Sequence, residues 1–206
     1  PISSYLKKYP KAAKDVTIRQ LLHHTSGIHN ITSVEGYPNG FGVKPMGFLK
    51  KIWDMPLDFA PREKHSYSNS GYILLGMIIE TISGTSYPEF IQREIFTPLK
   101  MKSSGCGRSQ NGALSYSYDF DKETFELIFI KDEPVRAYAA GCIYSNVYDL
   151  DKWIRALMEH SLISQNSLTE MLTPERGEYG YAYGIIKRST NHGVSYGHHG
   201  AIEGFK

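Results

Sequence analysis

The segment from residue 71 to 84, GYILLGMIIETISG, most constrains the fold, because its apolar residues recur at helical spacing. The residues on the shared helix face are Ile73, Leu74, Met77, Ile78 and Ile82. Gly84 is typical of a helix end. Such a helix needs apolar surface to pack against, and a 206-residue chain with 41% hydrophobic residues can supply it. The sequence therefore predicts one globular domain built around this helix.

Three other stretches have helix signals. Thr17 precedes IRQLLHH, with Gly27 as the expected stop, and Ser86 forms a capping-box pattern with Glu89 ahead of FIQREIF. Ser145 is expected to cap VYDLDKWIRALM. The apolar stripe of that helix is assigned to the core and comprises Leu150, Trp153, Ile154 and Leu157.

Strand patterns occur in two places. LSYSYDF and TFELIFI flank DKE and predict a β-hairpin near residues 114–130. Near the end, YGYAYGIIKR and VSYGHHGAIEGF, separated by STNHG, predict antiparallel strands. The fold class is therefore α+β. We expect a single domain over 1–206, with a mainly helical lobe over 1–178 and strands of an antiparallel sheet over 179–206.

Composition excludes several functions. A formal charge of +2, scattered along the chain, does not indicate a nucleic-acid surface. No apolar run approaches the roughly 20 residues of a membrane span, and no signal peptide opens the sequence. Cys106 and Cys142 match no metal-ligand spacing and are interpreted as buried or free thiols. No metal or other cofactor is expected, since the adjacent His23 and His24 would face different directions on a helix.

Two short polar segments could carry chemistry. In YSN, a Tyr67 phenol beside a lysine could move a proton for a serine nucleophile, and Asn69 could orient that lysine and a substrate amide. The alternative is a helix start capped by Ser68 or Ser70. In HHG, the expected edge strand could pair with an extended ligand, while His198 or His199 donates to a carboxylate or carbonyl. The alternative is a strand with two partly exposed imidazoles.

A third segment, LLHHTSGI, favours a structural interpretation, in which Thr25 and Ser26 bond nearby backbone and the paired histidines contact nothing special. Together with YSNSGYILLGMIIE, AAGCIYSNVYDLDKWIRAL and YGHHGAIEGF, however, it resembles a known family. The four collinear segments, from about Ile18 to Phe205, resemble the serine β-lactamase and penicillin-binding protein superfamily, in its class C and esterase-like branch.

This resemblance implies a β-lactamase/transpeptidase-like fold, a helical lobe packed on an antiparallel sheet that is incomplete in this chain. It also implies a serine that attacks a carbonyl to form an acyl-enzyme. Tyr67 would be the proton-transferring phenol and Asn69 the orienting carboxamide. His198, with His199, would contact substrate at the third motif, Gly200 would be that motif's glycine, and the Ala201 amide would supply an oxyanion-hole donor.

Two departures from the family pattern limit the prediction. His198 stands where β-lactamases carry lysine, which disfavours an efficient β-lactamase. The nucleophile motif Ser-x-x-Lys is matched only by Ser4 to Lys7, where Pro10 follows too soon for a long buried helix. We therefore expect the nucleophilic serine and its lysine to belong to residues outside this chain, which would be truncated at both ends.

The prediction is a serine hydrolase of the class C-like or D-Ala-D-Ala carboxypeptidase and esterase type. Its substrate would be a β-lactam, a D-amino-acid peptide or an ester. The alternative is a non-catalytic, penicillin-binding-like module that keeps the cleft for ligand binding. A metallohydrolase is disfavoured by the poor ligand spacing. Relatives are often exported, which favours export or the cell envelope.

Overall fold

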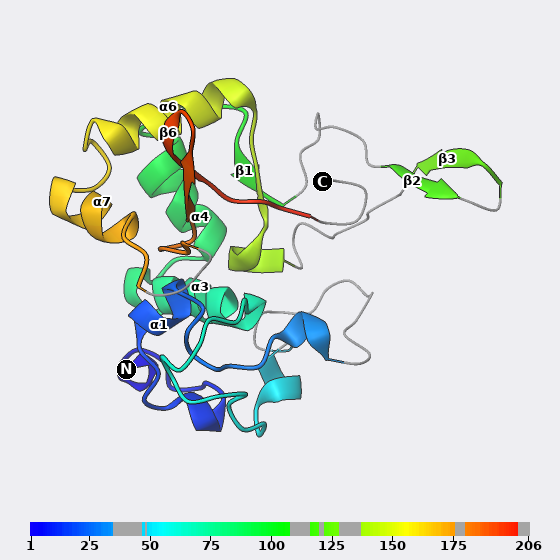
Figure 1. The fold of residues 1–206 in the computed structure, drawn as a ribbon, viewed down its shortest axis with the longest axis vertical. Coiled ribbons are helices and arrows are strands. Elements are labelled where there is room, and N and C mark those ends of the chain that lie inside the picture. The colour runs from blue at the N-terminus through cyan, green and yellow to red at the C-terminus, as the bar shows by residue number, and fades with distance from the viewer. Residues whose placement is uncertain are drawn as a thin grey trace.

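Helix α3 (Asn69–Ser83) lies at the centre of the computed structural model, as its periodicity predicted, although Ile82 of the predicted face is 66% exposed. It ends at Gly84, which has a left-handed φ of 69°. The structure describes residues 1–34, 47, 49–107, 116–119, 122–127, 137–175 and 180–201. Figure 1 shows α3 between the N-terminal segments with α1 (Ile18–Leu22) on one side and α4 (Tyr87–Ile91) on the other. The fold class is α+β, with helices and small antiparallel sheets.

Short turns of 3-10 helix surround the N-terminal side of α3. They are η1 (Ile2–Ser4), η2 (Lys11–Ala13), η3 (Ile31–Ser33) and η4 (Lys50–Ile52). Helix α1 begins with a capping box from Thr17. It ends at Leu22, before the predicted stop at Gly27. Gly27 lies in the loop beyond the helix and is needed there for two reasons: its φ is 74°, and a Cβ would lie 2.2 Å from the carbonyl oxygen of Phe59.

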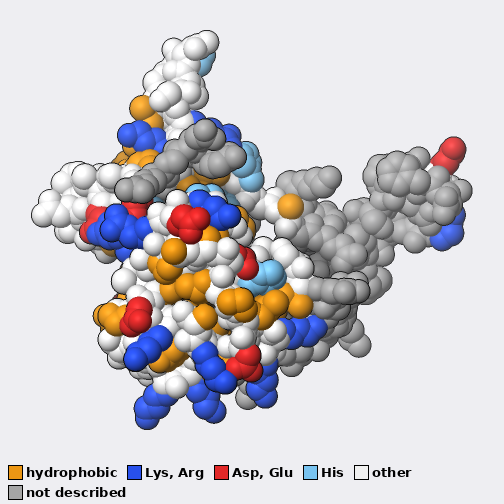
Figure 2. Space-filling model, turned by 60° about the horizontal axis from the view of Figure 1, so that its bottom comes forward, with side chains coloured by type: hydrophobic (Ala, Val, Ile, Leu, Met, Phe, Trp, Pro, Cys, Tyr) orange, Lys and Arg blue, Asp and Glu red, His pale blue; other side chains and the backbone are white. Residues whose placement is uncertain are grey.

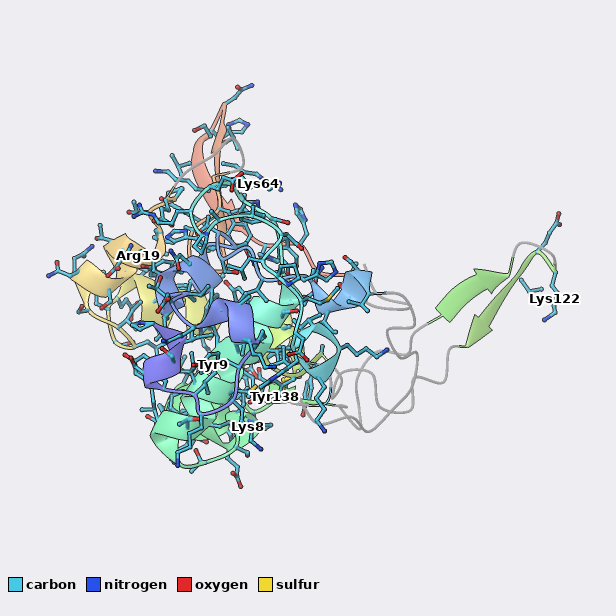
Figure 3. The ribbon with its side chains drawn as sticks, turned by 90° about the horizontal axis from the view of Figure 1, so that it is seen from below. Lys8, Tyr9, Arg19, Lys64, Lys122 and Tyr138 are labelled. Atoms are coloured by element: carbon cyan, nitrogen blue, oxygen red, sulfur yellow. A yellow bond between two sulfur atoms is a disulfide. The ribbon has the colours of Figure 1, made fainter. Side chains whose placement is uncertain are left out.

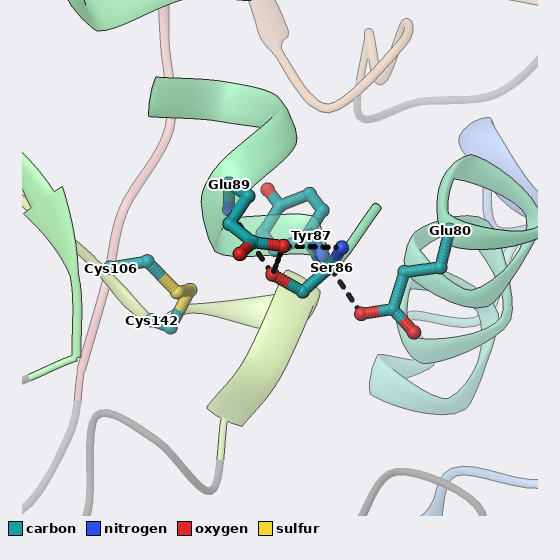
Figure 4. Close-up of a disulfide and its surroundings, with 6 residues drawn as sticks. All are labelled: Glu80, Ser86, Tyr87, Glu89, Cys106 and Cys142. Carbon is teal, nitrogen blue, oxygen red and sulfur yellow. Dashed lines mark hydrogen bonds between the residues drawn. A yellow bond between two sulfur atoms is a disulfide. The ribbon is translucent and has the colours of Figure 1, made fainter. Parts of the chain in front are cut away.

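The segments after α3 pack closely on it. Helix α4 carries the predicted capping box between Ser86 and Glu89, drawn in Figure 4, and continues into the π-helical turn η5 (Gln92–Phe96). The 3-10 turn η6 (Tyr138–Ala140) approaches α3 at Gly76. A Cβ at Gly76 would lie 2.4 Å from the Ala139 side chain, so only glycine fits this contact.

The described strands form three antiparallel pairs. They are β1 (Gly105–Cys106) with β4 (Ile143–Tyr144), β2 (Tyr116–Asp119) with β3 (Thr124–Leu127), and β5 (Ile186–Thr190) with β6 (Gly193–Gly197). The second pair is the predicted hairpin, whose outer residues lie outside the described part of the chain. The third pair turns through residues 191–192 with Thr190 opposite Gly193. The strands predicted from the alternating patterns are therefore present, although β6 ends at Gly197, before HHG.

The two cysteines form a disulfide, so the prediction of buried or free thiols was wrong. Cys106 on β1 and Cys142, just before β4, have Cα atoms 4.9 Å apart and are separated by 36 residues in sequence. Figure 4 shows the bond near α4. Pairing at this separation depends on how β1 and β4 meet, which spacing does not reveal.

Helix α6 (Val147–Met158) buries half of the predicted stripe, Trp153 and Leu157. Its cap is Asn146, whose side chain accepts from the amide of Asp149, and not Ser145. Asp149 is 2% exposed and accepts from the Ser103 amide at 2.7 Å. This buried carboxylate faces the core together with the residues sharing its side of the helix, namely Trp153, Ala156 and Leu157. Two residues assigned to the core, Leu150 and Ile154, are instead 44% and 50% exposed.

The core gathers residues from every N-terminal turn, from α1 and α3 and from the segments after α3. Its fully buried members with the largest side chains include Ile2, Leu21, Ile31, Leu49, Ile52, Ile73 and Leu74. On the outside, Figure 2 shows acidic side chains lying among the lysines and arginines of one face. Among the described residues, none of the helices combines the length and the hydropathy of a membrane span.

Candidate active site

The turn after α1 positions the backbone that leads into α3. His23 is the C-cap residue of α1, and His24 adopts the left-handed conformation with φ 56°. The His24 carbonyl accepts from the amide of Ser66 at 2.9 Å, and its ring Nδ1 accepts from the amide of Ser68 at 3.1 Å. Tyr67 is thus held between two residues whose backbones are bonded to His24.

The start of α3 is fixed by tertiary contacts more than by a cap. Ser68 occupies the N-cap position, but its hydroxyl makes no capping bond. Ser70 is fully buried, and its hydroxyl donates to the His29 carbonyl at 2.8 Å and accepts from the Ile31 amide at 2.9 Å. The alternative of a helix capped by either serine side chain was therefore wrong. Ser70 instead joins α3 to the loop before η3.

Asn69 is held by a second asparagine. The side-chain oxygen of Asn30 accepts from the Asn69 amide at 3.1 Å and lies 3.5 Å from its Nδ2, which also donates to the Thr32 hydroxyl at 3.3 Å. The Asn69 side chain is partly exposed. Contacts with Asn30 and with Thr32 of η3 therefore orient the carboxamide through its nitrogen. Its oxygen takes part in neither contact.

Tyr67 is the aromatic residue at the surface of this cluster. Its ring centroid lies 4.2 Å from that of His24, 6.3 Å from Tyr181 and 6.0 Å from His198. The residue is 43% exposed, which leaves part of the side chain open to a ligand. Burial of the rest raises the pKa of the phenol, so Tyr67 keeps its proton in these surroundings.

Tyr181 connects the helical lobe with the end of β6, a role that sequence reasoning missed. Its hydroxyl lies 3.0 Å from Nε2 of His24 and 2.9 Å from Nε2 of His198. Burial strongly raises the pKa of Tyr181, so it is a neutral phenol. From the sequence, the stretch around Tyr181 predicts only a strand. A buried tyrosine needs a hydrogen-bond partner, but the sequence does not say which.

The segment that carries Tyr181 is itself anchored to α1. The hydroxyl of Tyr183 donates to Glu170 of α7 (Gln165–Met171) at 2.8 Å, and Glu170 forms an ion pair with Arg19. Figure 3 shows Arg19 beside α7. The Tyr183 amide also donates to the Met171 carbonyl at 3.1 Å, and Tyr181 forms a β-bridge with Ile186 of β5. Backbone contacts with α7 and β5 therefore hold residues 181–183 in place in addition to the Tyr183 hydroxyl.

The histidine pair was expected to contact nothing special, and this was wrong. His23 and His24 are each 1% exposed. Nδ1 of His23 lies 3.3 Å from the Tyr181 carbonyl, and its ring packs edge-on at 4.7 Å from Tyr183. Burial lowers the pKa of His24 from 6.5 to about 3, with His65 and His198 adding to the effect. Both histidines belong to the buried support of the site.

The residues predicted at the third motif follow β6 in an irregular, exposed segment. His198 contacts Tyr181, while Nε2 of His199 meets the guanidinium of Arg188 on β5. Gly200 and Ala201 are exposed, and a Cβ built at Gly200 would touch nothing within 4 Å. The structure thus brings Tyr67 and His198 together and places Gly200 in open space. The expected edge strand over HHG is absent, since β6 ends at Gly197.

The segment from Ser4 to Lys7, which matches the Ser-x-x-Lys pattern, does not belong to the Tyr67 cluster. Ser4 ends the turn η1, and both Ser4 and Lys7 are exposed. Lys7 lines a shallow pocket of about 260 Å³ whose other lining residues, Tyr9, Lys11, Lys14 and Trp53, do not belong to the Tyr67 cluster. In Figure 3, Lys8 and Tyr9 lie away from the β5–β6 hairpin, near which Lys64 is labelled. In the ranges described above, no group of three His, Cys, Asp or Glu residues could hold a metal ion.

The fold, a helical lobe with small antiparallel sheets, is of the β-lactamase/transpeptidase-like class. The chain belongs to the beta-lactamase family, whose family model matches residues 1–206. A penicillin-binding protein of Bacillus subtilis is 30% identical over 215 residues, covering 92% of this chain and 47% of that protein. A teichoic acid D-alanine hydrolase of Staphylococcus aureus is 27% identical over 195 residues, covering 92% and 47%.

Solved structures show the same relationship. A D-stereospecific amidohydrolase from Streptomyces sp. has a TM-score of 0.85 at 26% identity, covering 99% of this chain and 67% of that one. A D-amino acid amidase from Ochrobactrum anthropi, complexed with L-phenylalanine amide, has a TM-score of 0.82 at 26% identity, covering 99% and 62%. The chain spans about half the length of the curated relatives it matches.

Proposed function

We propose that this chain carries one side of the active site of a serine hydrolase that works through an acyl-enzyme. The observation that carries the proposal is the convergence of Tyr67, from the start of α3, with His198, from the end of β6, at a ring-centroid distance of 6.0 Å. The family membership adds to it, as do relatives whose names include D-alanine hydrolase and D-amino acid amidase.

In the proposed reaction, a serine hydroxyl attacks the substrate carbonyl and its proton passes to Tyr67. Tyr67 returns that proton to the departing amine or alcohol, and water then hydrolyses the ester so formed. Because burial raises the pKa of Tyr67, the phenol needs a neighbouring cation to act as a base. We propose that this cation is the lysine of the Ser-x-x-Lys motif. The motif, with its nucleophilic serine, is proposed to lie outside these 206 residues.

The remaining roles follow the geometry. Asn69 has its amide nitrogen bonded to Asn30 and Thr32, so its oxygen is available to orient that lysine or a substrate N–H. The amide of Ala201 is proposed as an oxyanion-hole donor beside the open space at Gly200. The proposed substrates are amides or esters of D-amino acids, as in D-Ala-D-Ala carboxypeptidases and esterases of class C-like type.

The test uses the full-length protein, a fluorescent penicillin and a p-nitrophenyl ester. Tyr67→Phe should lower acylation or ester turnover by about 100-fold or more, the scale of a lost general acid–base group, without changing the melting temperature. Tyr196→Phe, at an exposed tyrosine on β6, is the matched control and should retain activity. Unchanged activity in Tyr67→Phe would contradict the role of Tyr67. No adduct and no turnover in the parent protein would instead favour the non-catalytic, ligand-binding alternative.

A further inference from the structure

The bonds around Tyr181 have one consistent direction. The Ser68 amide can only donate, so Nδ1 of His24 is an acceptor and carries no proton. His24 is neutral, as its lowered pKa of about 3 requires, so its proton lies on Nε2 and is donated to the Tyr181 oxygen. The His24 ring is 1% exposed, and each of its two nitrogens has one of these protein groups as its partner.

The same assignment can be made from the other end. The carbonyl of His199 can only accept, so Nδ1 of His198, which is bonded to it, must carry a proton. Nε2 of His198 lies 2.9 Å from the Tyr181 hydroxyl, and with the ring proton on Nδ1 it accepts the Tyr181 proton. Tyr181 therefore accepts from His24 and donates to His198, which phenylalanine cannot reproduce. The Tyr72 hydroxyl also interacts with Tyr181 but donates its own proton to the Leu22 carbonyl at 3.1 Å, so it does not take the place of His24 as the donor.

We infer that Tyr181 is a positioning residue that, with His24, fixes the tautomer and orientation of His198 from the buried turn after α1. The inference rests on the proposed function for its catalytic consequence. The bonds run unbroken from the Ser68 amide, which stands between Tyr67 and Asn69, to the His199 carbonyl. One face of the site is thereby tied to the other by a chain of four hydrogen bonds.

These four hydrogen bonds change the role that the resemblance assigns to His198, which was contact with the substrate. With Nε2 accepting and Nδ1 donating, both ring nitrogens are occupied, and neither can donate to a substrate carboxylate. The substrate contact assigned to this position therefore falls to the ring edge and to the backbone beyond it, at Gly200 and Ala201. The role of His198 is therefore to position the backbone groups of Gly200 and Ala201, with its ring held by hydrogen bonds at both nitrogens.

Tyr181→Phe and Tyr183→Phe are a matched pair two residues apart. Each removes one phenolic hydroxyl, but that of Tyr183 bonds to Glu170 and not to His198. The measurement is nitrogen NMR of histidine-labelled full-length protein, with the His198 signal assigned from His198→Gln. The parent protein and Tyr183→Phe should show His198 as the Nδ1–H tautomer. Tyr181→Phe should show a mixture or the Nε2–H form, and should lower kcat/KM by about tenfold, the effect of one lost hydrogen bond.

The outcomes separate this inference from the proposed function. An Nε2–H tautomer of His198 in the parent protein would overturn the inference, and that result needs no folded variant. An active protein in which Tyr181→Phe matches Tyr183→Phe in both tautomer and kcat/KM would also overturn it. A protein without activity whose His198 tautomer changes in Tyr181→Phe alone would support the positioning role while contradicting the hydrolase.

Discussion

Acidification should destabilise this protein through His24. The ring is 1% exposed, and its Nδ1 accepts from a backbone amide, so the folded state has no place for a second ring proton. Burial lowers its pKa from 6.5 to about 3. Between these two values the unfolded chain binds a proton that the folded protein does not, so the free energy of unfolding falls as pH falls through this window.

The magnitude follows from linkage. Each pH unit inside the window costs about 1.4 kcal/mol, so lowering the pH from 8 to 5 should remove about 2 kcal/mol of unfolding free energy through His24 alone. His23 is also buried and His65 is partly buried, and burial lowers the pKa of both rings, so they add to the slope. A loss of this size is a large fraction of the stability of an ordinary domain.

The assay is urea unfolding of the full-length protein from pH 5 to pH 8, followed by the fluorescence of Trp53 and Trp153. His24→Gln should be less stable at every pH, but its dependence on pH should be flatter by about one proton, or about 1.4 kcal/mol per pH unit. His192→Gln, in the exposed turn between β5 and β6, should keep the parent slope. If both variants keep that slope, His24 is not a buried neutral ring and the reasoning fails.

Two further predictions concern the covalent and backbone restraints. Replacing Cys106 and Cys142 by serine should cost about 4 kcal/mol of unfolding free energy, from loop closure over 36 residues, and a reductant should then have no further effect on urea unfolding. A variant as stable as the oxidised parent would argue against the bond. Gly27→Ala should cost more than about 2 kcal/mol, because its Cβ would lie 2.2 Å from the Phe59 carbonyl oxygen. Gly84→Ala, also left-handed but open, should cost only about 1 kcal/mol, and equal losses in thermal unfolding would refute the clash.

Local patterns in the sequence determined the elements around the site. The periodicity of α3, the capping box at Ser86 and Glu89, and the alternating strands before and after the turn at 191–192 act over two to four residues. The interactions that stabilise these elements can therefore be recognised in a short stretch of sequence. The α+β class could also be predicted from these local patterns. The resemblance that pointed to the beta-lactamase family likewise rested on four short segments, and the comparisons confirm it.

Tertiary structure decided which side chains meet. The buried carboxylate of Asp149 faces the core together with Trp153 and Leu157, which leaves Leu150 and Ile154 exposed. The disulfide joins residues 36 positions apart. The His24–Tyr181 bond spans 157 positions, so no local pattern records it. The sequence shows a pair of histidines and a tyrosine, but only the packing of residues 181–183 against α1 gives each ring nitrogen its partner and its proton, because a hydrogen bond is specified by where both of its groups are held.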